Sequence, residues 1–273
     1  MIDIHSHILP GLDDGPKDLE KSLAMARIAV AGGIEHIVCT PHWVARAFEN
    51  TREMVIRAVE EFQKKLTQNG IALRVHPGAE LHLDPDLPRK IESGEVATLN
   101  DTGRYALIEL PDICLLQNLG RFFGSLLDRG ITPVISHPER NLALLRAPSY
   151  LHSWVEMGVL AQVTAASVSG RFGPQIERFS LFLLEHLLVH VIATDAHDPQ
   201  MRAPVLLDAV ERVQRLLGPE AAQKMVKETP RQILSGNRVL AGAPLPLVRS
   251  SGGASLSKKI FSFLGLTGRG YIL

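Results

Sequence analysis

The feature that most constrains the fold is a regular alternation of short apolar, β-branched runs with longer amphipathic segments. Most successive runs begin roughly 25–40 residues apart, which is the length of a strand followed by a helix. The runs predict seven strands: Ile2–His5, Ile34–Cys39, Leu73–Pro77, Tyr105–Glu109, Thr132–Ser136, Val159–Val163 and Val189–Ala193.

The segments between these strands have the apolar spacing of helices. They are Leu19–Ala31, Arg52–Gln68, Gln117–Arg129, Ser149–Glu156 and Pro174–Leu188. Strict alternation of strand and helix predicts a parallel sheet. Because the chain has seven such units and no GxGxxG motif, an α/β fold closed or nearly closed into a barrel fits better than an open nucleotide-binding sheet.

The chain changes character toward its C-terminus. After Pro204 the pattern is purely helical, and the predicted helices are Val205–Leu217, Glu220–Lys227 and Pro230–Leu234. From Ala241 the sequence runs through APLPL, SSGGAS and KKIFSFLGL, which predicts a flexible linker and a short amphipathic segment. We therefore expect a barrel domain over residues 1–240 and a tail over 241–273, which is either frayed or a weak contact for a partner or a membrane.

Composition narrows the possible partners. The formal net charge is zero, so no overall electrostatic bias favours nucleic acid or an anionic membrane. Cys39 and Cys114 are too few for a disulfide framework and are expected to be buried thiols in a reducing compartment. The N-terminus lacks the pattern of a signal peptide, and no apolar run approaches the roughly 18 residues of a membrane helix. These features predict a cytoplasmic protein; they do not predict its oligomeric state.

Residues that commonly bind metals gather where the predicted strands end. In parallel α/β folds the loops at the C-terminal edge of the sheet form the active site. Six of the seven strands lead into such residues, which chance does not readily produce. The residues are His5, His7, His42, Glu80, Glu109, His137, Asp195 and His197.

Spacing supports a shared site. His5 and His7 are two residues apart, so their side chains can face the same way, and the same holds for Asp195 and His197. Imidazoles mixed with carboxylates, without thiolates, suit divalent Mn, Fe or Zn rather than a closed structural zinc site. Glu80 is the natural bridging carboxylate, which would allow two ions to lie about 3.5–4 Å apart.

Each residue also has an ordinary structural interpretation. A single His-x-His pair is weak evidence, and His42 and His137 lie beside prolines, as turn residues do. Asp195 and His197 could cap a helix, and Glu109 could bind backbone amides. We prefer the metal site because all these coincidences would have to fall at one edge of one sheet. No role is predicted for the remaining histidines, although His82 is close enough to Glu80 to stay open: His36, His76, His82, His152, His186 and His190.

Two arginines follow the strand-end residues. Arg140 comes after His137, and Arg202 lies five residues past His197. A guanidinium group beside a metal cluster suits an anionic substrate, because its planar fork matches the oxygens of a phosphate. The sequence has no recognisable nucleophile elbow and no glycine-rich phosphate loop, so the expected nucleophile is a metal-bound hydroxide.

Together these motifs resemble the PHP (polymerase and histidinol phosphatase) family. The motifs are HSHILPGLDDG at residues 5–15, TPH at 40–42, GAE at 78–80, SHPER at 136–140 and TDAH at 194–197. Within the family, the chain is most similar to the manganese-dependent protein-tyrosine phosphatases of bacterial capsule systems. The HxHILPGxDDG opening is fairly specific to that branch, whereas HxH alone is shared with amidohydrolases.

The resemblance implies a distorted (β/α)7 barrel with extra C-terminal helices and three Mn²⁺ ions, with Fe or Zn as alternatives. It assigns the first ion to His5, His7, Glu80 and Asp195. It assigns the second to Glu80, Glu109 and His137. It assigns the third to Asp14, His42 and His197, and Asp14 is a ligand that the residues alone did not single out. It also assigns Arg140 and Arg202 to the phosphate.

The implied activity is hydrolysis of phosphotyrosine on the tail of a bacterial tyrosine kinase of capsule or exopolysaccharide biosynthesis. A general acid, if one acts, would be His42, His197 or Asp14. Alternatives are a small-molecule phosphatase of the histidinol-phosphate type and a PHP phosphodiesterase. A barrel amidohydrolase usually has a bridging lysine where this chain has Glu80. A non-catalytic metal-binding adaptor would not need to keep Arg140 or Asp195.

Overall fold

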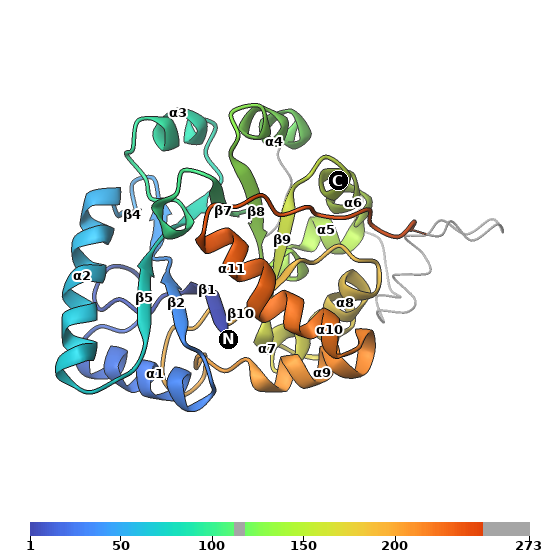
Figure 1. The fold of residues 1–273 in the computed structure, drawn as a ribbon. Helices are drawn as coiled ribbons and strands as arrows, with labels where there is room; N and C mark the ends of the chain where they lie inside the picture. Colours follow the sequence, from blue (N-terminus) through green and yellow to red (C-terminus); the bar gives the residue numbers. More distant parts are fainter. Residues whose placement is uncertain (112–117, 248–273) are drawn as a thin grey trace, which may run out of the picture.

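The computed structural model describes residues 1–111 and 118–247 as an α/β fold with two sheets (Figure 1). The smaller sheet has the strand order β1-β2-β5, and all its pairs are parallel. These strands are β1 (Ile2–Ser6), β2 (His36–Cys39) and β5 (Arg74–Pro77). The larger sheet has the order β10-β9-β8-β7-β6-β3-β4. Its strands are β3 (His42–Val44), β4 (Phe48–Glu49), β6 (Glu80–His82), β7 (Tyr105–Glu109), β8 (Thr132–Ser136), β9 (Leu160–Thr164) and β10 (Val191–Ala193).

Two chain segments contribute a strand to each sheet. After β2 the chain passes Pro41 and enters β3, and after β5 it passes Gly78 and enters β6. Proline has no N–H to donate to a ladder, which interrupts the first segment. A side chain at Gly78 would lie 2.6 Å from Val38 Cγ1, so only glycine allows this close approach. β3 and β6 therefore begin displaced from β2 and β5, carrying the site residues His42 and Glu80.

Contacts beyond β10 join the far edge of the larger sheet to β1. Ser6 and Ala196 form an isolated parallel bridge, and Asp195 N donates to the carbonyl of His5 at 2.8 Å. The carboxylate of Asp3 accepts hydrogen bonds from both the backbone N–H and the hydroxyl of Thr194. The first and last strands are therefore held side by side by backbone and side-chain bonds.

Helices flank the strands as the alternation predicted. α1 (Leu19–Ala31), α2 (Arg52–Gln68) and α6 (Ser149–Glu156) have the predicted bounds. α4 (Leu119–Leu127) and α8 (Pro174–Glu185) are shorter than predicted, and Gln117 lies outside the described residues. Asp18 and Thr51 accept hydrogen bonds from the first turns of α1 and α2, which explains why those helices begin where they do.

Short elements escaped prediction because a single turn is too brief to show a helical period. They are α3 (Leu87–Glu92), α5 (Leu142–Arg146), α7 (Ala165–Val168) and two 3-10 turns, η1 (Leu99–Asp101) and η2 (Pro138–Arg140). The additional strands β3, β4 and β6 were missed because two or three residues are too few to show the alternation of a strand. Among the helices of the described ranges, none has the length and apolar character needed to cross a bilayer.

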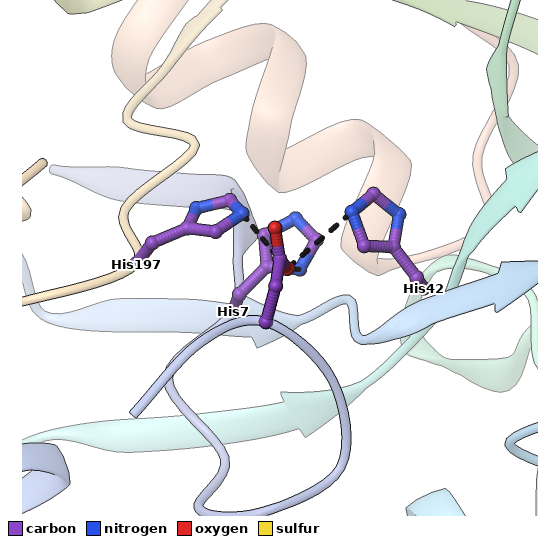
Figure 2. A group of neighbouring side chains, drawn as sticks. His7, His42 and His197 are labelled. Atoms are coloured by element: carbon purple, nitrogen blue, oxygen red, sulfur yellow. Dashed lines mark ion pairs between the residues drawn. The ribbon is translucent and has the colours of Figure 1, made fainter. Parts of the chain in front are cut away.

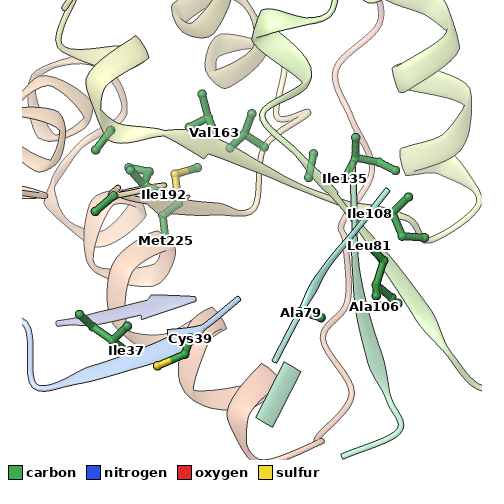
Figure 3. Packing of buried hydrophobic residues seen from close by; sticks show 14 of the residues in the cluster. Ile37, Cys39, Ala79, Leu81, Ala106, Ile108, Ile135, Val163, Ile192 and Met225 are labelled. Carbon is green, nitrogen blue, oxygen red and sulfur yellow. The ribbon is translucent and has the colours of Figure 1, made fainter. Parts of the chain in front are cut away.

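Two apolar clusters fill the fold. Alternate residues of one strand belong to different clusters: Val38 packs with Leu107 and Val134, whereas Ile37 and Cys39 belong to the larger cluster shown in Figure 3. This division follows from the period of two in a strand, which turns successive side chains to opposite faces. The strands are thus buried on both faces, as expected of a parallel sheet covered by helices.

The C-terminal helices are α9 (Leu207–Leu217), α10 (Pro219–Gln223), a π-helical turn η3 (Lys224–Glu228) and α11 (Thr229–Leu234) (Figure 1). Of these, η3 packs against β10 and β1, and α11 packs against β1, whereas α9 packs against α7 and α10. Residues 235–247, here called the C-terminal strap, then run along the sheet. Tyr105 donates its hydroxyl proton to Asn237 O and accepts from Val239 N, and Leu245 N donates to His186 O. The linker and amphipathic segment predicted beyond residue 247, and Cys114, lie outside the described residues.

His190 connects the strap to β9. Its Nδ1 accepts from Ala161 N at 3.1 Å, so its Nε2 carries the proton that is donated to Ala241 O at 3.0 Å. The ring is buried, and it joins two segments of the chain although the sequence predicted no role for it. Burial lowers the pKa of His190 to about 4.

We expect this histidine to make stability depend on pH. Because the folded pKa lies below the unfolded one, the unfolded chain binds the proton more readily, and stability is lost as pH falls from about 6.5 toward 4. Between pH 7 and pH 5 the loss attributable to His190 should be about 2 kcal/mol. Denaturant unfolding of wild type and His190→Gln in chelator should show a steeper acid loss in wild type. Parallel curves for the two proteins would contradict this.

Candidate metal centre

The structure brings all nine predicted ligand residues to one edge of the strands. His5 belongs to β1, and His7 follows it; His42 lies in β3, Glu80 begins β6, and Glu109 ends β7. The others come from loops that follow strands: Asp14 after β1, His137 after β8, and Asp195 and His197 after β10. The ligand atoms of seven of them fall into three overlapping groups, and Asp195 and His137 lie beside His5 and Glu80.

The first group contains His5, His7, Glu80 and Asp195. His5 Nε2 lies 3.2 Å from His7 Nε2, 3.3 Å from Glu80 Oε2 and 3.4 Å from Asp195 Oδ1. His7 Nε2 lies 3.3 Å from Glu80 Oε2 and 3.5 Å from Asp195 Oδ1. Ligand atoms bonded to one ion at about 2.0–2.2 Å are separated by roughly 3.3–3.6 Å in tetrahedral geometry, so these four atoms fit a shared cation.

The second group surrounds the other side of Glu80. His137 Nε2 lies 2.9 Å from Glu80 Oε1 and 3.8 Å from Glu109 Oε1. His42 Nδ1 lies 3.1 Å from Glu80 Oε2 and 3.7 Å from Glu109 Oε2. Both His42 Nδ1 and Glu80 Oε2 are buried without a hydrogen-bond partner in the described chain. Such atoms are costly to bury unless something else satisfies them, and a cation between them would do so.

The third group converges on Asp14. Its Oδ1 lies 3.2 Å from His197 Nε2, 3.5 Å from His42 Nε2 and 4.0 Å from His7 Nδ1. Figure 2 shows the rings of His7, His42 and His197 converging on one point. The two nitrogens of His42 thus face different groups, whereas the family resemblance had assigned this histidine to the third ion alone.

Two residues that sequence reasoning missed orient the first histidines. Gln162 Oε1 lies 2.8 Å from His5 Nδ1, and Asp13 Oδ2 lies 2.6 Å from His7 Nδ1. A ring nitrogen that donates to such an acceptor leaves the other nitrogen unprotonated and aimed at a metal. His7 Nδ1 is therefore occupied by Asp13, which leaves Asp14, His42 and His197 as ligands of the third group.

Asp13 also shapes the loop that carries Asp14. Its carboxylate accepts from Gly15 N at 2.9 Å and from His42 N at 3.0 Å. A Cβ at Gly15 would lie 2.2 Å from His7 O, so this tight loop requires glycine. The adjacent acidic pair in DDG was a possible signal for Asp13, and a glutamine inside the buried run LAQVT was one for Gln162.

Strained backbone occurs at two of the ligand residues. His137 has φ 31° and Asp195 has φ 52°, a left-handed region that residues with side chains seldom adopt. Such conformations cost on the order of 1–3 kcal/mol and persist where surrounding contacts enforce them. Here the unusual φ of His137 turns its side chain toward Glu80, and that of Asp195 turns its side chain toward His5.

The electrostatics favour the unprotonated form of the acidic ligands and of His197. The hydrogen bond from His197 holds the pKa of Asp14 well below its ordinary value. Burial alone would raise the pKa of Asp195, but the charges of His5, His137, Arg202 and Arg140 outweigh it and lower that pKa. Burial lowers the pKa of His197, assisted by the charge of His7. Carboxylates and a neutral imidazole are the forms that bind metals. Burial alone would lower the pKa of His5 and His7, but the neighbouring carboxylates outweigh it and raise both, so a cation at the first group would have to displace these protons.

Arg140 and Arg202 both donate to the second oxygen of Asp195. Arg140 Nη1 lies 2.6 Å and Arg202 Nη2 lies 2.5 Å from Asp195 Oδ2. Each arginine side chain is about one quarter exposed, with relative accessibilities of 25% and 28%. Asp195 therefore faces the first group with one oxygen and fixes two guanidinium groups with the other.

The other histidines fall into three sets. His82 Nδ1 lies 3.4 Å from Glu109 Oε2, so it is at the edge of the second group. His152 and His186 make local contacts on their own helices, to Glu156 and to Phe182 O. His36, the first residue of β2, contacts His76 of β5, and neither is among the three ligand groups.

Comparison with known proteins places this geometry in a family. The family described as "Capsular polysaccharide synthesis, CpsB/CapC" matches residues 1–235. The chain belongs to this CpsB/CapC family. It is 35% identical over 263 residues to tyrosine-protein phosphatase YwqE of Bacillus subtilis, covering 96% of this chain and 100% of YwqE. It is 34% identical over 242 residues to tyrosine-protein phosphatase CpsB of Streptococcus pneumoniae, covering 86% of this chain and 98% of CpsB.

A solved structure agrees with this assignment. A chain from the crystal structures of YwqE from Bacillus subtilis and CpsB from Streptococcus pneumoniae, described as unique metal-dependent tyrosine phosphatases, matches with a TM-score of 0.87. The identity is 36%, and the match covers 91% of this chain and 100% of that chain. The α/β fold of this family is therefore the fold of the chain.

Glu80→Gln tests the bridging carboxylate. The substitution keeps the shape of the side chain but removes a charge that lies within 3.3 Å of four imidazole nitrogens. Metal analysis after dialysis should show at least one equivalent less bound metal than in wild type, and turnover should be abolished. Circular dichroism should change little. Unchanged metal content would exclude Glu80 as a bridge.

Proposed function

We propose that this chain is a metal-dependent protein-tyrosine phosphatase that hydrolyses phosphotyrosine on a bacterial tyrosine kinase of capsule or exopolysaccharide biosynthesis. The observation that carries the proposal is the position of Asp195, which faces the first of three neighbouring ligand groups with one oxygen and fixes two arginines with the other. Ligand groups alone would suit many hydrolases. Two guanidinium groups beside them select an anionic, phosphate-bearing substrate.

The donor atoms fit divalent cations, and we propose Mn²⁺, with Fe or Zn as alternatives. His5, His7, Glu80 and Asp195 would hold the first ion. Bound ions supply positive charge that polarises the phosphate and lowers the pKa of water. The second ion would take Glu80, Glu109 and His137 together with His42 Nδ1, and the third Asp14, His42 Nε2 and His197.

The arginines have a separate role in the proposed reaction. Arg140 and Arg202 are fixed by Asp195 before substrate arrives, so little side-chain entropy remains to be lost on binding. Their free N–H groups would bind the equatorial oxygens of the phosphoryl group and stabilise charge in the transition state. We assign binding and orientation of the phosphate to these two residues.

The leaving group reduces the need for a strong acid. A phenolate has a pKa near 10, so it departs more readily than an alkoxide. Asp14 and His197 are held unprotonated by their surroundings, which suits metal ligation better than proton donation. His42 faces a ligand group with each of its two ring nitrogens, so it too suits metal ligation better than proton donation.

The proposal extends to the architecture and location of the protein. We propose that the strands close into the distorted (β/α)7 barrel expected from the sequence, supported by the contacts that join Ser6 to Ala196 and by the chain segments that lead from β2 directly into β3 and from β5 directly into β6. We retain residues 1–240 as the domain and 241–273 as a tail. The buried free thiol of Cys39 supports an action in the cytoplasm.

Three substrates would separate the proposed activity from its alternatives. Protein reconstituted with Mn²⁺ should release phosphate from a phosphotyrosine peptide with much higher kcat/KM than from histidinol phosphate or a bis-aryl phosphate. Omission of metal, with chelator present, should abolish release. Robust turnover of histidinol phosphate without peptide hydrolysis would overturn the assignment to tyrosine phosphatases.

Arg140→Ala should weaken phosphate engagement while leaving the metals in place. We expect kcat/KM to fall at least tenfold, equivalent to one to several kcal/mol of transition-state stabilisation. Arg146→Ala is a matched control, because Arg146 is an exposed arginine at the end of α5. Equal kinetics for Arg140→Ala and wild type would remove Arg140 from the substrate site.

A further inference from the structure

A cavity whose lining combines apolar surface with several polar and cationic side chains lies away from the metal-ligand groups, beside β1, β2 and the C-terminal helices. It has a volume of about 340 Å³. Its lining includes Ile2 of β1, His36 of β2, His76 of β5 and Asn100 of η1, with Lys227 and Arg231 from the C-terminal helices. Figure 1 shows α11 passing beside β1 near the N-terminus, where this cavity is found. Volumes of this size accommodate small molecules.

An ordered chain of hydrogen bonds forms one side of the cavity. Asn100 Nδ2 donates to Leu234 O at 2.8 Å, which turns Asn100 Oδ1 toward His76 Nδ1 at 3.1 Å. His76 Nδ1 is therefore the donor, and His76 Nε2 accepts from His36 Nδ1 at 3.0 Å. His36 Nε2 has no hydrogen-bond partner in the described chain; burial lowers the pKa of His36, so a proton on this nitrogen would need a bound anion to stabilise it.

Two cationic side chains, Lys227 and Arg231, lie on the other side of the cavity. Lys227 and Arg231 are exposed and four residues apart, so they lie on the same side of their helical segment. Neither forms an ion pair within residues 1–111 and 118–247. Like charges at this spacing repel each other by a few tenths of a kcal/mol, and an anion between them would relieve that cost. Glu35 is the one acidic residue of the lining.

We propose that this cavity binds a small oligophosphate anion. Two cationic side chains one turn apart match the two linked anionic groups of a diphosphate, and Arg231 can bind phosphate oxygens bidentately. A proton on His36 Nε2 would add a further donor. The neighbouring imidazoles and the size of the cavity favour this ligand over a single small ion. The site does not depend on the proposed phosphatase activity, because it shares no residue with the metal-ligand groups.

Calorimetry with inorganic pyrophosphate on the metal-loaded full chain tests the proposal. Pyrophosphate can also occupy the metal centre, so wild type should show two binding events. Arg140→Ala should weaken one event, and Lys227→Ala or Arg231→Ala should weaken the other about tenfold. Glu35→Gln should tighten that second event several-fold, because it removes a like charge. Lys64→Ala, an exposed lysine of α2 outside the lining, is the matched control and should behave as wild type.

Residue-specific chemical modification locates the second event. With pyrophosphate present, His36 should be protected from diethyl pyrocarbonate, and this protection should disappear in the Lys227→Ala/Arg231→Ala double variant. Arg231→Gln keeps most of the side-chain bulk in case the alanine variant unfolds. A single binding event in wild type, or a second event unchanged in these variants, would overturn the proposal. Loss of phosphatase activity alone would not bear on it.

Discussion

The buried carboxylate of Glu80 is the interaction on which the rest of the site depends. Its two oxygens lie within 3.3 Å of nitrogens from His5, His7, His42 and His137, and the residue has no exposed surface. A carboxylate in such a place is strongly unfavourable unless positive charge surrounds it. The imidazoles, and the cations they are suited to bind, supply that charge. The break between β5 and β6 at Gly78 is what allows Glu80 to reach this central position.

The same site depends on contacts between the first and last strands. Asp3 on β1 binds Thr194, the residue before Asp195, while His5 O accepts from Asp195 N. These bonds set the relative position of His5 and Asp195, which belong to one ligand group although nearly two hundred residues separate them. Asp195 in turn holds both arginines. The candidate metal-ligand groups and the two arginines are therefore linked through a single carboxylate whose place is set by strand pairing.

The ends of the strands away from the ligand residues differ from the metal-ligand end in the charges of their side chains. There the strap closes over β7 and β9 through Tyr105 and His190, and the cavity beside His36 faces unpaired cations. Three strands have one end at this cavity and continue to the ligand groups: β1 to His5, β2 through β3 to His42, and β5 through β6 to Glu80. One end of the fold thus carries the ligand groups, built from carboxylates and imidazoles, and the other carries the cavity, whose charged residues are mostly cationic.

The sequence by itself determined the parallel α/β class, all seven principal strands and the residues at their ends, because both signals are local. Periodicity marks a strand or helix, and a polar residue after an apolar run marks the edge of a sheet. Asp14 came only from family resemblance, since a loop residue has no period. Only the tertiary structure revealed Asp13 and Gln162 behind the histidines, the two-sided role of His42 and the burial of His190. These depend on atoms from distant segments lying within a few ångströms, and no local pattern records which segments will meet.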